Sequence, residues 1–197
     1  MKNIVVLVSG GGSNLQAIID AVSRGEIDAH ITAVIADRRG AFALERAKSA
    51  GIPAIEIDRW DKNLFPQKED FVQKVAETID EYAPGLIVLV GYLSILPPET
   101  TEKYKNRIIN VHPSLIPKFC GMGFYGMKVH EAVLAAGETE SGATVHYVDE
   151  GVDTGGIILQ EKVPVIAGDT AKTLAARVLE VEHRIIVEAI KQLTVDN

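Results

Sequence analysis

The sequence predicts an α/β protein with a doubly wound, mostly parallel sheet, an antiparallel strand pair in its C-terminal half and a long closing helix. Two observations predict this fold. Through residues 1–90, short β-branched apolar runs alternate with segments of helical periodicity, which is the order of elements in a parallel sheet. Beyond residue 140, two strand patterns follow each other across a short connection, which favours an antiparallel pair added to that sheet.

The first half contains strand patterns that alternate with helical patterns. Uninterrupted apolar runs such as IVVLV and LIVLV are typical of strands whose two faces are both buried. Apolar residues three and four positions apart mark the helices between them, and we expect Ser13 or Asn14 to cap the first helix. The predicted strands span residues 4–8, 31–36, 54–58 and 86–90, and the predicted helices begin near residue 13, cover 41–50 and cover 67–82.

The second half is less regular. A fifth strand is expected at 107–111, and the proline and glycine residues of 113–126 predict a loop rather than a regular element. Alternating residues indicate the late strands, and an apolar stripe of helical period marks a long last helix. The later predicted elements are a helix at 127–136, strands at 142–148 and 157–165, and a closing helix at 170–193.

Length and composition exclude several classes of protein. At 197 residues, the chain is expected to form one domain and to bury a core without a metal or disulfide. The formal charge of −7 argues against binding along a nucleic-acid backbone, and the single cysteine, Cys120, excludes a disulfide framework. No apolar run reaches the roughly 18 residues of a membrane span, and the run at 4–8 is too short for a signal peptide, so we expect a protein of the reducing cytoplasm.

Three consecutive glycines separate the first predicted strand from the first helix, in the segment SGGGSN at residues 9–14. Glycine lets the backbone approach a ligand closely, and the free N–H groups at a helix N-terminus favour an anion such as a phosphate. No lysine follows as in a nucleoside-triphosphate loop, and Leu15 stands where a dinucleotide motif needs its third glycine. The segment therefore predicts binding of a lone monophosphate, against the alternative of a bare strand-to-helix turn.

Polar residues end the fifth predicted strand, in the segment NVHPSL at residues 110–115. Asn110 and His112 should project from the same face, because strand side chains repeat every two residues. At the carboxyl end of a parallel strand, the asparagine amide could stabilise an oxyanion and the histidine could transfer a proton. The alternative is a core histidine that bonds to the backbone. His146 could line the same pocket, whereas His130 is expected to be exposed on its helix.

Two further segments could contribute to a site. The acidic, glycine-rich turn at 149–156 is either a solvated turn or the place from which an aspartate approaches His112 and raises the pKa of that histidine. The apolar loop at 91–97 either holds a flat heterocycle with its main chain or leads into a helix. The spacing of the histidines matches no metal-binding motif, so we expect no catalytic metal, and Cys120 has no positioned base to make it a nucleophile.

Four segments give the chain an end-to-end resemblance to the phosphoribosylglycinamide formyltransferase family, the folate-dependent enzymes of purine synthesis. The HPSLxP pattern is shared with related formyltransferases and hydrolases, whereas the GSNL opening points to the glycinamide ribonucleotide branch. The resemblance implies one formyltransferase domain over 1–197 with a Rossmann-like fold, in which 1–100 bind phosphate and 101–197 bind folate and carry out catalysis. The segments are IVVLVSGGGSNLQAII, INVHPSLIPKF, SGATVHYVDEGVDTGGIILQ and ARVLEVEH.

The resemblance also implies substrates and site residues. The substrates would be glycinamide ribonucleotide and the formyl donor 10-formyltetrahydrofolate, with no metal, nucleic acid or membrane as partner, in a monomer or homodimer. The ribonucleotide phosphate would contact Gly12, Ser13 and Asn14, and its ribose would contact Glu182. The donor would contact Lys68, Leu93, Ser94, Ile95, Leu96, Asn110 and the turn at 149–153, and the catalytic residues would be Asn110, His112 and Asp153.

The reaction implied is attack of a primary amine on a formamide-like carbonyl. We expect Asn110 and a protonated His112 to stabilise the oxyanion, and Asp153 to keep His112 charged and to orient a water that carries the proton. Two features depart from the family pattern. Ser94 stands where relatives often carry arginine, and the segment at 119–127 differs from the commoner form, which leaves its behaviour as a lid open.

Three alternatives stand beside this expectation. A formyltetrahydrofolate deformylase uses a similar trio with water as acceptor, but it carries an N-terminal regulatory domain, which we expect to be absent because the first strand begins at residue 4. A methionyl-tRNA formyltransferase would need a C-terminal tRNA-binding domain and more positive charge. A non-catalytic module that binds a nucleotide monophosphate would need only the glycine loop. It would not explain the Asn110–His112 pair or the turn at 149–156.

Overall fold

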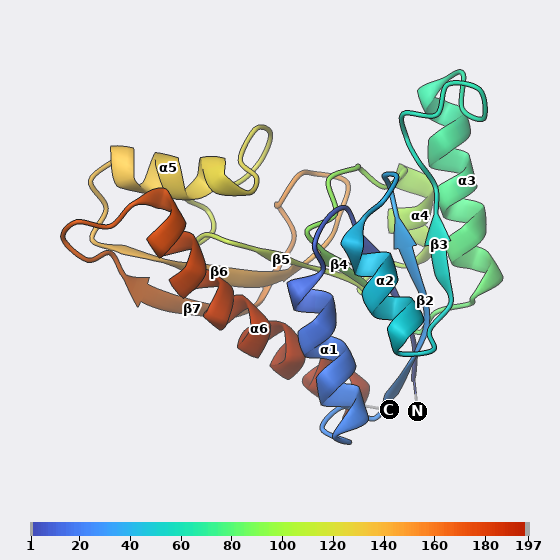
Figure 1. Cartoon of the computed structure of the whole chain (residues 1–197), viewed down its shortest axis with the longest axis horizontal. Helices are drawn as coiled ribbons and strands as arrows, with labels where there is room; N and C mark the ends of the chain where they lie inside the picture. Colours follow the sequence, from blue (N-terminus) through green and yellow to red (C-terminus); the bar gives the residue numbers. More distant parts are fainter. Residues whose placement is uncertain (1, 196–197) are drawn as a thin grey trace.

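Residues 2–195 are described by the computed structural model, and they form one seven-stranded sheet with helices on both faces (Figure 1). The strand order across the sheet is β3-β2-β1-β4-β5-β6-β7. The strands are β1 (Lys2–Val8), β2 (Ala29–Ala36), β3 (Ala54–Glu56), β4 (Leu86–Val90), β5 (Ile108–His112), β6 (Glu140–Tyr147) and β7 (Ile157–Pro164). The helices are α1 (Ser13–Ser23), α2 (Phe42–Ser49), α3 (Lys68–Glu81), α4 (Pro98–Lys103), α5 (Met127–Ala135) and α6 (Ala171–Val195).

Strand direction divides the sheet into two parts. The pairs among β1 to β5 are parallel, whereas β6 is antiparallel to both β5 and β7. This confirms the predicted mostly parallel α/β sheet and its antiparallel C-terminal pair. The sheet grows from β1 toward β3 on one side and toward β4 on the other. The loops after β1 and β4 therefore diverge at the carboxyl edge, which is where open α/β sheets bind ligands.

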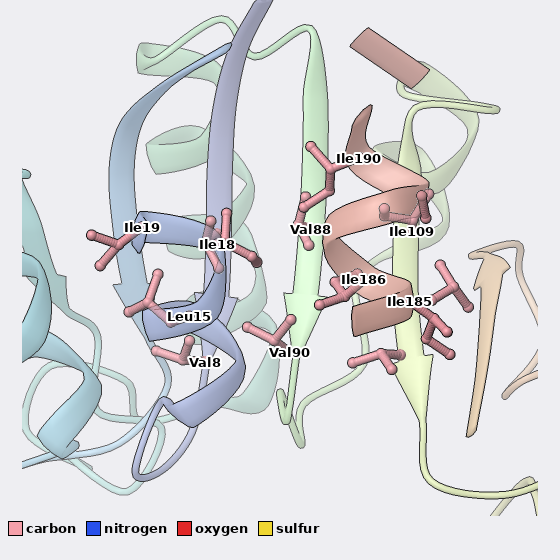
Figure 2. Close-up of a cluster of buried hydrophobic side chains, with 14 of the residues drawn as sticks. Val8, Leu15, Ile18, Ile19, Val88, Val90, Ile109, Ile185, Ile186 and Ile190 are labelled. Atoms are coloured by element: carbon pink, nitrogen blue, oxygen red, sulfur yellow. The ribbon is translucent and has the colours of Figure 1, made fainter. Parts of the chain in front are cut away.

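The two faces of the sheet are buried against different helices. On β1, Ile4, Val6 and Val8 belong to one core and Val5 and Leu7 to the other, as the two-residue repeat of a strand requires. Figure 2 shows apolar side chains of α1 and α6 against β1, β4 and β5 on the first face. Side chains of α3 fill the core on the opposite face. Helices on both faces make this the doubly wound arrangement that the sequence predicts.

The turn between β1 and α1 requires glycine for a steric reason. Gly12 is the N-cap of α1 and has a φ of 72°, in the left-handed region that glycine adopts without strain. A Cβ at this position would lie 2.6 Å from the Cβ of Ala43 in α2. The prediction that Ser13 or Asn14 caps α1 is wrong, because both lie inside the helix and the cap makes no side-chain hydrogen bond.

Some element boundaries differ from those predicted. The sequence analysis gives no bounds for α4, only the alternative that the loop at 91–97 leads into a helix, because six residues are too few to show a helical period. β3 ends at Glu56 rather than at residue 58, and α6 continues to Val195 rather than ending at 193. Although α6 contains 25 residues, no helix within residues 2–195 is both long and apolar enough to cross a membrane.

Candidate active site

A cavity of about 590 Å³ opens beside the ends of β4 and β5. Segments that are distant in the sequence form its walls. They are residues 91–96 after β4, residues 110–113 at the end of β5, the loop at 121–127, most of residues 146–154, and one face of α6. This cavity contains the residues that the sequence analysis singles out after β4, in β5 and in the turn after β6.

Asn110, His112 and Asp153 meet in the cavity. Asn110 and His112 come from β5, two residues apart, and Asp153 approaches from the connection between β6 and β7. The carboxylate of Asp153 lies 3.5 Å from the amide nitrogen of Asn110 and 3.5 Å from Nδ1 of His112. The side chains of His112 and Asp153 are only 6% and 11% exposed, so water screens their interaction weakly.

Asp153 is held as a carboxylate. Its Oδ2 accepts a hydrogen bond from the backbone N–H of Gly121 at 2.9 Å. Burial alone would raise the pKa of Asp153, but the His146 imidazole, the charge of His112 and the Gly121 amide outweigh burial and lower that pKa below its ordinary value. The residue is therefore ionised at neutral pH and can attract a proton or a cation.

His112 lies between two acceptors. Its Nε2 is 2.9 Å from the carbonyl oxygen of Phe119, and because a carbonyl only accepts, Nε2 must carry a hydrogen. Nδ1 faces Asp153, so a proton there is stabilised by the carboxylate. Burial nevertheless lowers the pKa of His112, and the opposing effects of Asp153 and Phe119 only partly offset it. Asp153 thus acts in the expected direction on the pKa of His112, and its role in keeping the ring charged during the reaction stays a prediction.

His146 positions the amide of Asn110. Its Nδ1 lies 2.8 Å from the carbonyl oxygen of Tyr147, so this nitrogen carries the hydrogen in the neutral ring. Nε2 is then free to accept a hydrogen bond from the Asn110 amide, 3.1 Å away. This orients the amide nitrogen of Asn110 toward His146 and Asp153. The prediction that His146 lines the same cavity as His112 is confirmed.

His130 does not lie where the sequence analysis expects it. It is 4% exposed and lines the cavity from α5, so the expectation of an exposed histidine is wrong. Burial is the main cause that lowers its pKa. The neighbouring Val129 and Val133 are also buried, because α5 packs against α6. These apolar neighbours in the sequence could have indicated that the side of the helix that carries His130 faces the interior.

The glycine turn connects to the cavity through one buried pair. Asn14 in α1 donates a hydrogen bond to the Glu182 carboxylate in α6 at 2.8 Å, and Glu182 lines the cavity. Burial raises the pKa of Glu182 to about 7, although the Asn14 amide partly offsets this. The turn itself is fixed from behind, because Arg46 of α2 donates to the Gly11 carbonyl at 2.8 Å. The amide edge of the α1 N-terminus therefore lies next to the cavity rather than in its wall.

The loop after β4 contributes apolar side chains to the cavity wall. Leu93 and Ile95 are 41% and 52% exposed, so these apolar side chains are available to a ligand. Lys68 is not brought to this wall, because it lies exposed at the start of α3 and is not part of the cavity lining. The residues of this loop that the resemblance assigns to the donor all line the cavity, namely Leu93, Ser94, Ile95 and Leu96.

The segment at 119–127 supplies backbone groups that the sequence analysis missed. Its Phe119 carbonyl and Gly121 amide bond to His112 and Asp153, and backbone contacts leave no side-chain signal in a sequence. Cys120 lies between them, and burial raises the pKa of its thiol, which does not favour a nucleophile. The side chains that this segment adds to the cavity wall are Met122, Phe124, Tyr125 and Met127.

Comparison with known proteins identifies relatives over most of the chain. Residues 2–190 match the family described as Formyl transferase. The chain is 43% identical over 183 residues to the phosphoribosylglycinamide formyltransferase of Escherichia coli (strain K12), covering 93% of this chain and 82% of that protein. It is 40% identical over 197 residues to the chloroplastic phosphoribosylglycinamide formyltransferase of Vigna unguiculata, covering 98% of this chain but only 61% of the longer plant protein.

Solved structures share the fold. The glycinamide ribonucleotide transformylase 1 from Symbiobacterium toebii superposes with a TM-score of 0.89 at 41% identity, covering 97% of this chain and 86% of that one. A formyltetrahydrofolate deformylase from Pseudomonas syringae pv. tomato str. DC3000 has a TM-score of 0.86 but is 26% identical, covering 98% of this chain and 61% of that one. The fold is shared with both proteins to a similar degree, but the sequence is more similar to the transformylase than to the deformylase. The chain belongs to the formyl transferase family and, within it, to the phosphoribosylglycinamide formyltransferases.

Proposed function

We propose that this protein transfers the formyl group of 10-formyltetrahydrofolate to the amine of glycinamide ribonucleotide, giving formylglycinamide ribonucleotide and tetrahydrofolate. The observation that carries this proposal is the meeting of Asn110, His112 and Asp153 in one cavity. The cavity is lined by Glu182, which accepts a hydrogen bond from Asn14 at the glycine turn, and also by the apolar side chains of the loop after β4. This layout suits an anionic ribonucleotide on one side and a flat heterocycle on the other.

The ribonucleotide is proposed to lie along the N-terminus of α1. Free backbone N–H groups of Gly12, Ser13 and Asn14 suit its phosphate, because helix N-termini carry unpaired donors and partial positive charge. The Glu182 side chain, at the edge of the cavity, suits the ribose hydroxyls as a hydrogen-bond partner. This orientation brings the amine at the other end of the substrate toward His112.

The donor is proposed to insert its pterin between the loop after β4 and the turn at 149–153. Leu93, Ile95 and Leu96 supply apolar contacts there, and backbone groups of the loop suit the polar edge of the ring. Asn110 would hold the formyl oxygen. We assign no contact to Lys68, because its position on α3 is not part of the cavity wall.

In the proposed reaction, the amine nitrogen attacks the formyl carbon and the carbonyl oxygen becomes an oxyanion. The Asn110 amide and His112 stabilise this charge by donating hydrogen bonds in a poorly hydrated site. Nε2 of His112 is committed to the Phe119 carbonyl at 2.9 Å, whereas Nδ1 lies 3.5 Å from Asp153, beyond ordinary hydrogen-bond length. Nδ1 carries no hydrogen while the ring is neutral, so it is the nitrogen that must take up a proton before it can donate to the oxyanion.

The proton lost by the attacking amine must reach the departing N10 of the donor. Asp153 is ionised in the cavity, so its carboxylate can orient a water that accepts the first proton and returns one to N10. The C–N10 bond then breaks as the oxyanion collapses to the new formamide. Proton uptake by His112 during this sequence is favoured because both of its nitrogens face acceptors.

A spectrophotometric assay tests this function. Mixing the protein with both substrates should convert 10-formyltetrahydrofolate to tetrahydrofolate with equal formation of the formylated ribonucleotide. His112→Ala should lower kcat by about 10²–10³, the effect of losing one oxyanion donor, without unfolding the protein. Donor consumption without the ribonucleotide would instead indicate a deformylase, and binding of the ribonucleotide with no consumption would indicate a non-catalytic module. Full activity of the variant would refute the role of His112.

The compartment and assembly stay predictions. We propose that the protein works in the reducing cytoplasm, since its one cysteine makes no use of an oxidising environment. We also propose that it acts as a monomer or a homodimer.

A further inference from the structure

The segment that follows His112 turns back and contacts the histidine ring. Its residues 114–119 end at Phe119, whose carbonyl oxygen lies 2.9 Å from Nε2 of His112. Phe119 has a φ of 52°, in the left-handed region that is unfavourable for a bulky side chain. Such a conformation persists only where the surrounding structure fixes the backbone. The contacts that fix residues 114–119 therefore decide where this carbonyl lies.

A row of three paired residues crosses the sheet beside this segment. His112 of β5 pairs with Thr144 of β6, and Thr144 pairs with Gln160 of β7. These three strands are neighbours at the antiparallel edge of the sheet (Figure 1). Directly paired residues place their side chains on the same face. The side chains of Thr144 and Gln160 are therefore on the same face of the sheet as the His112 ring.

The Thr144 hydroxyl joins β6 to the segment. It donates a hydrogen bond to the Ser114 carbonyl at 2.6 Å and accepts one from the Ile116 N–H at 3.3 Å. Thr144 has no exposed surface, and Gln160 donates to the same hydroxyl oxygen at 2.9 Å. A hydroxyl has one donor and two acceptor positions, so all three are in use. The hydroxyl thus fixes two backbone groups of the segment.

Gln160 holds the same segment from the outermost strand. Its amide nitrogen donates to the Ile116 carbonyl at 3.0 Å as well as to Thr144. An amide nitrogen carries two hydrogens, so both are in use. Thr144 and Gln160 together hold the N–H and the carbonyl of Ile116. Neither side chain is part of the cavity wall, so any effect on the reaction must pass through the segment.

The same network continues to the peptide bond before Phe119. The buried Ser114 hydroxyl donates to the Lys118 carbonyl at 2.7 Å, while Thr144 holds the Ser114 carbonyl. A chain of hydrogen bonds therefore connects Gln160 on the edge strand to the residue that precedes Phe119.

The position of the Phe119 carbonyl decides which nitrogen of the neutral His112 ring carries the hydrogen. A neutral imidazole has one N–H, and its hydrogen-bond partners determine which nitrogen bears it. Phe119 requires the hydrogen on Nε2, whereas the Asp153 carboxylate, 3.5 Å from Nδ1, attracts it to the other nitrogen. If the carbonyl moved away, the hydrogen would pass to Nδ1, and a charged ring would have one acceptor instead of two.

We propose that Gln160 is a positioning residue for His112. It acts through Thr144 and the segment 114–119, which hold the Phe119 carbonyl against Nε2. The ring then keeps its hydrogen on Nε2 while it is neutral, and it has an acceptor on each side when it becomes charged beside the oxyanion. The benefit to the reaction rests on the proposed function, whereas the position of the hydrogen does not.

Kinetics of Gln160→Met test this role. Methionine keeps the length of the side chain but has no amide to donate, and position 160 is exposed, so the variant should fold. kcat should fall about threefold to tenfold, the effect of one hydrogen bond, while KM for both substrates stays within about twofold of wild type. The matched control is Lys162→Met on the same strand, which should leave kcat unchanged because the ammonium of Lys162 bonds Glu140 instead of the segment.

A pair of variants at Thr144 tests the intermediate step. Thr144→Val removes the hydroxyl with little change in shape, so the Ser114 carbonyl and the Ile116 N–H lose their partner. kcat should fall about 10²-fold, because a displacement of about 1 Å in a catalytic group can cost this much. Thr144→Ser keeps the hydroxyl and should recover most of that loss. If Thr144→Val does not fold, Gln160→Met decides the outcome.

Nitrogen NMR of the His112 ring gives a readout that does not depend on activity. Measured above the pKa of His112, the chemical shifts show which ring nitrogen carries the hydrogen, and His112→Ala identifies the signals by their loss. The hydrogen should lie on Nε2 in the wild type and in Lys162→Met. In Gln160→Met, and more so in Thr144→Val, part of the population should carry it on Nδ1.

Four results would overturn the inference. They are a wild-type ring with its hydrogen on Nδ1, a hydrogen that stays wholly on Nε2 in Gln160→Met, an unchanged kcat in that variant, or a loss in Thr144→Ser as large as in Thr144→Val. If the wild type consumes no donor in the presence of the ribonucleotide, the proposed function fails. The NMR comparison then decides by itself whether Gln160 positions His112.

Discussion

Two contacts of the His112 imidazole raise its pKa, whereas burial of the ring lowers that pKa. The Phe119 carbonyl requires a hydrogen on Nε2, and Asp153 favours a proton on Nδ1, while loss of water favours the neutral ring. The balance leaves the pKa of His112 below its ordinary value in the protein without substrate. An anionic centre that develops beside the ring during the reaction would move this balance toward the charged form.

At this scale, Asp153→Asn should lower the pKa of His112 further. The carboxylate stabilises the imidazolium, so its removal takes away a contribution that raises that pKa. We expect kcat to fall by about 10²–10⁴, since proton transfer loses its base. An NMR titration of His112 measures the shift, with Asp149→Asn in the same turn as control, because Asp149 bonds Gly151 and Thr154 instead. An unchanged or higher pKa of His112 would contradict this account.

A second prediction at the residue scale concerns Glu182. Its pKa is raised from 4.5 to about 7, so the folded protein binds this proton more tightly than the unfolded chain. That contribution to stability is fully present below pH 4.5 and is lost as the pH rises toward 7. Glutamine does not ionise, so Glu182→Gln does not lose stability as the pH rises. The free energy of unfolding of this variant should exceed that of wild type by up to about 3 kcal/mol at pH 8 and by little at pH 4.

Urea denaturation at the two pH values measures this difference. The matched control is Glu180→Gln on the same helix, because Glu180 is exposed and should show no comparable dependence on pH. Equal gains at both pH values would mean that packing, and not the ionisation of Glu182, causes the effect. We also expect weaker ribonucleotide binding in Glu182→Gln, since a neutral amide offers the ribose one acceptor where the carboxylate offers two.

Among the elements, the turn from β1 into α1 is the most constrained. Gly12→Ala would place a Cβ 2.6 Å from the Cβ of Ala43 and 2.8 Å from its Cα, and would force alanine into a φ of 72°. We expect a loss of about 2–4 kcal/mol in the free energy of unfolding, from overpacking together with backbone strain. The same change should weaken ribonucleotide binding, because α1 must move away from α2.

Gly10→Ala is the control within the same turn. A Cβ at Gly10 would meet nothing within 4 Å, so its effect on chemical denaturation should be small. If the two variants were equally stable, close contact between the turn and α2 would not be the reason for glycine at position 12.

Across the whole molecule, one sheet joins the two halves of the chain. β4 and β5 pair in parallel through residues 87–90 and 108–111, and α6 packs against both α1 and the strands β6 and β7. Neither half therefore has a complete core of its own, and we expect one cooperative unfolding transition. Trp60 is the only tryptophan and lies in the first half, so its fluorescence and the far-UV circular dichroism of the whole chain should change at the same urea concentration. Two separate midpoints would contradict this.

Periodicity was enough to predict most of the fold. The buried strands β1 and β4 appear as continuous apolar runs because both of their faces are covered, and α6 appears as an apolar stripe because only one of its faces is. The bounds of α4 could not be predicted, because a helix of six residues is too short to show a repeat. The N-cap of α1 was misjudged because its position depends on contact with Ala43, which is 31 residues away in the sequence.

The sequence by itself determined the order of the elements, the burial of the sheet on both faces, the glycine turn and the shared face of Asn110 and His112, since all of these follow from repeats within one segment. The tertiary structure decided the distance of His112 from Asp153, the burial of His130 and the contact of Gln160 with Ile116. Those contacts join loops and helices from separate parts of the chain. Their geometry depends on how whole elements pack against one another, and no local pattern of residues records it.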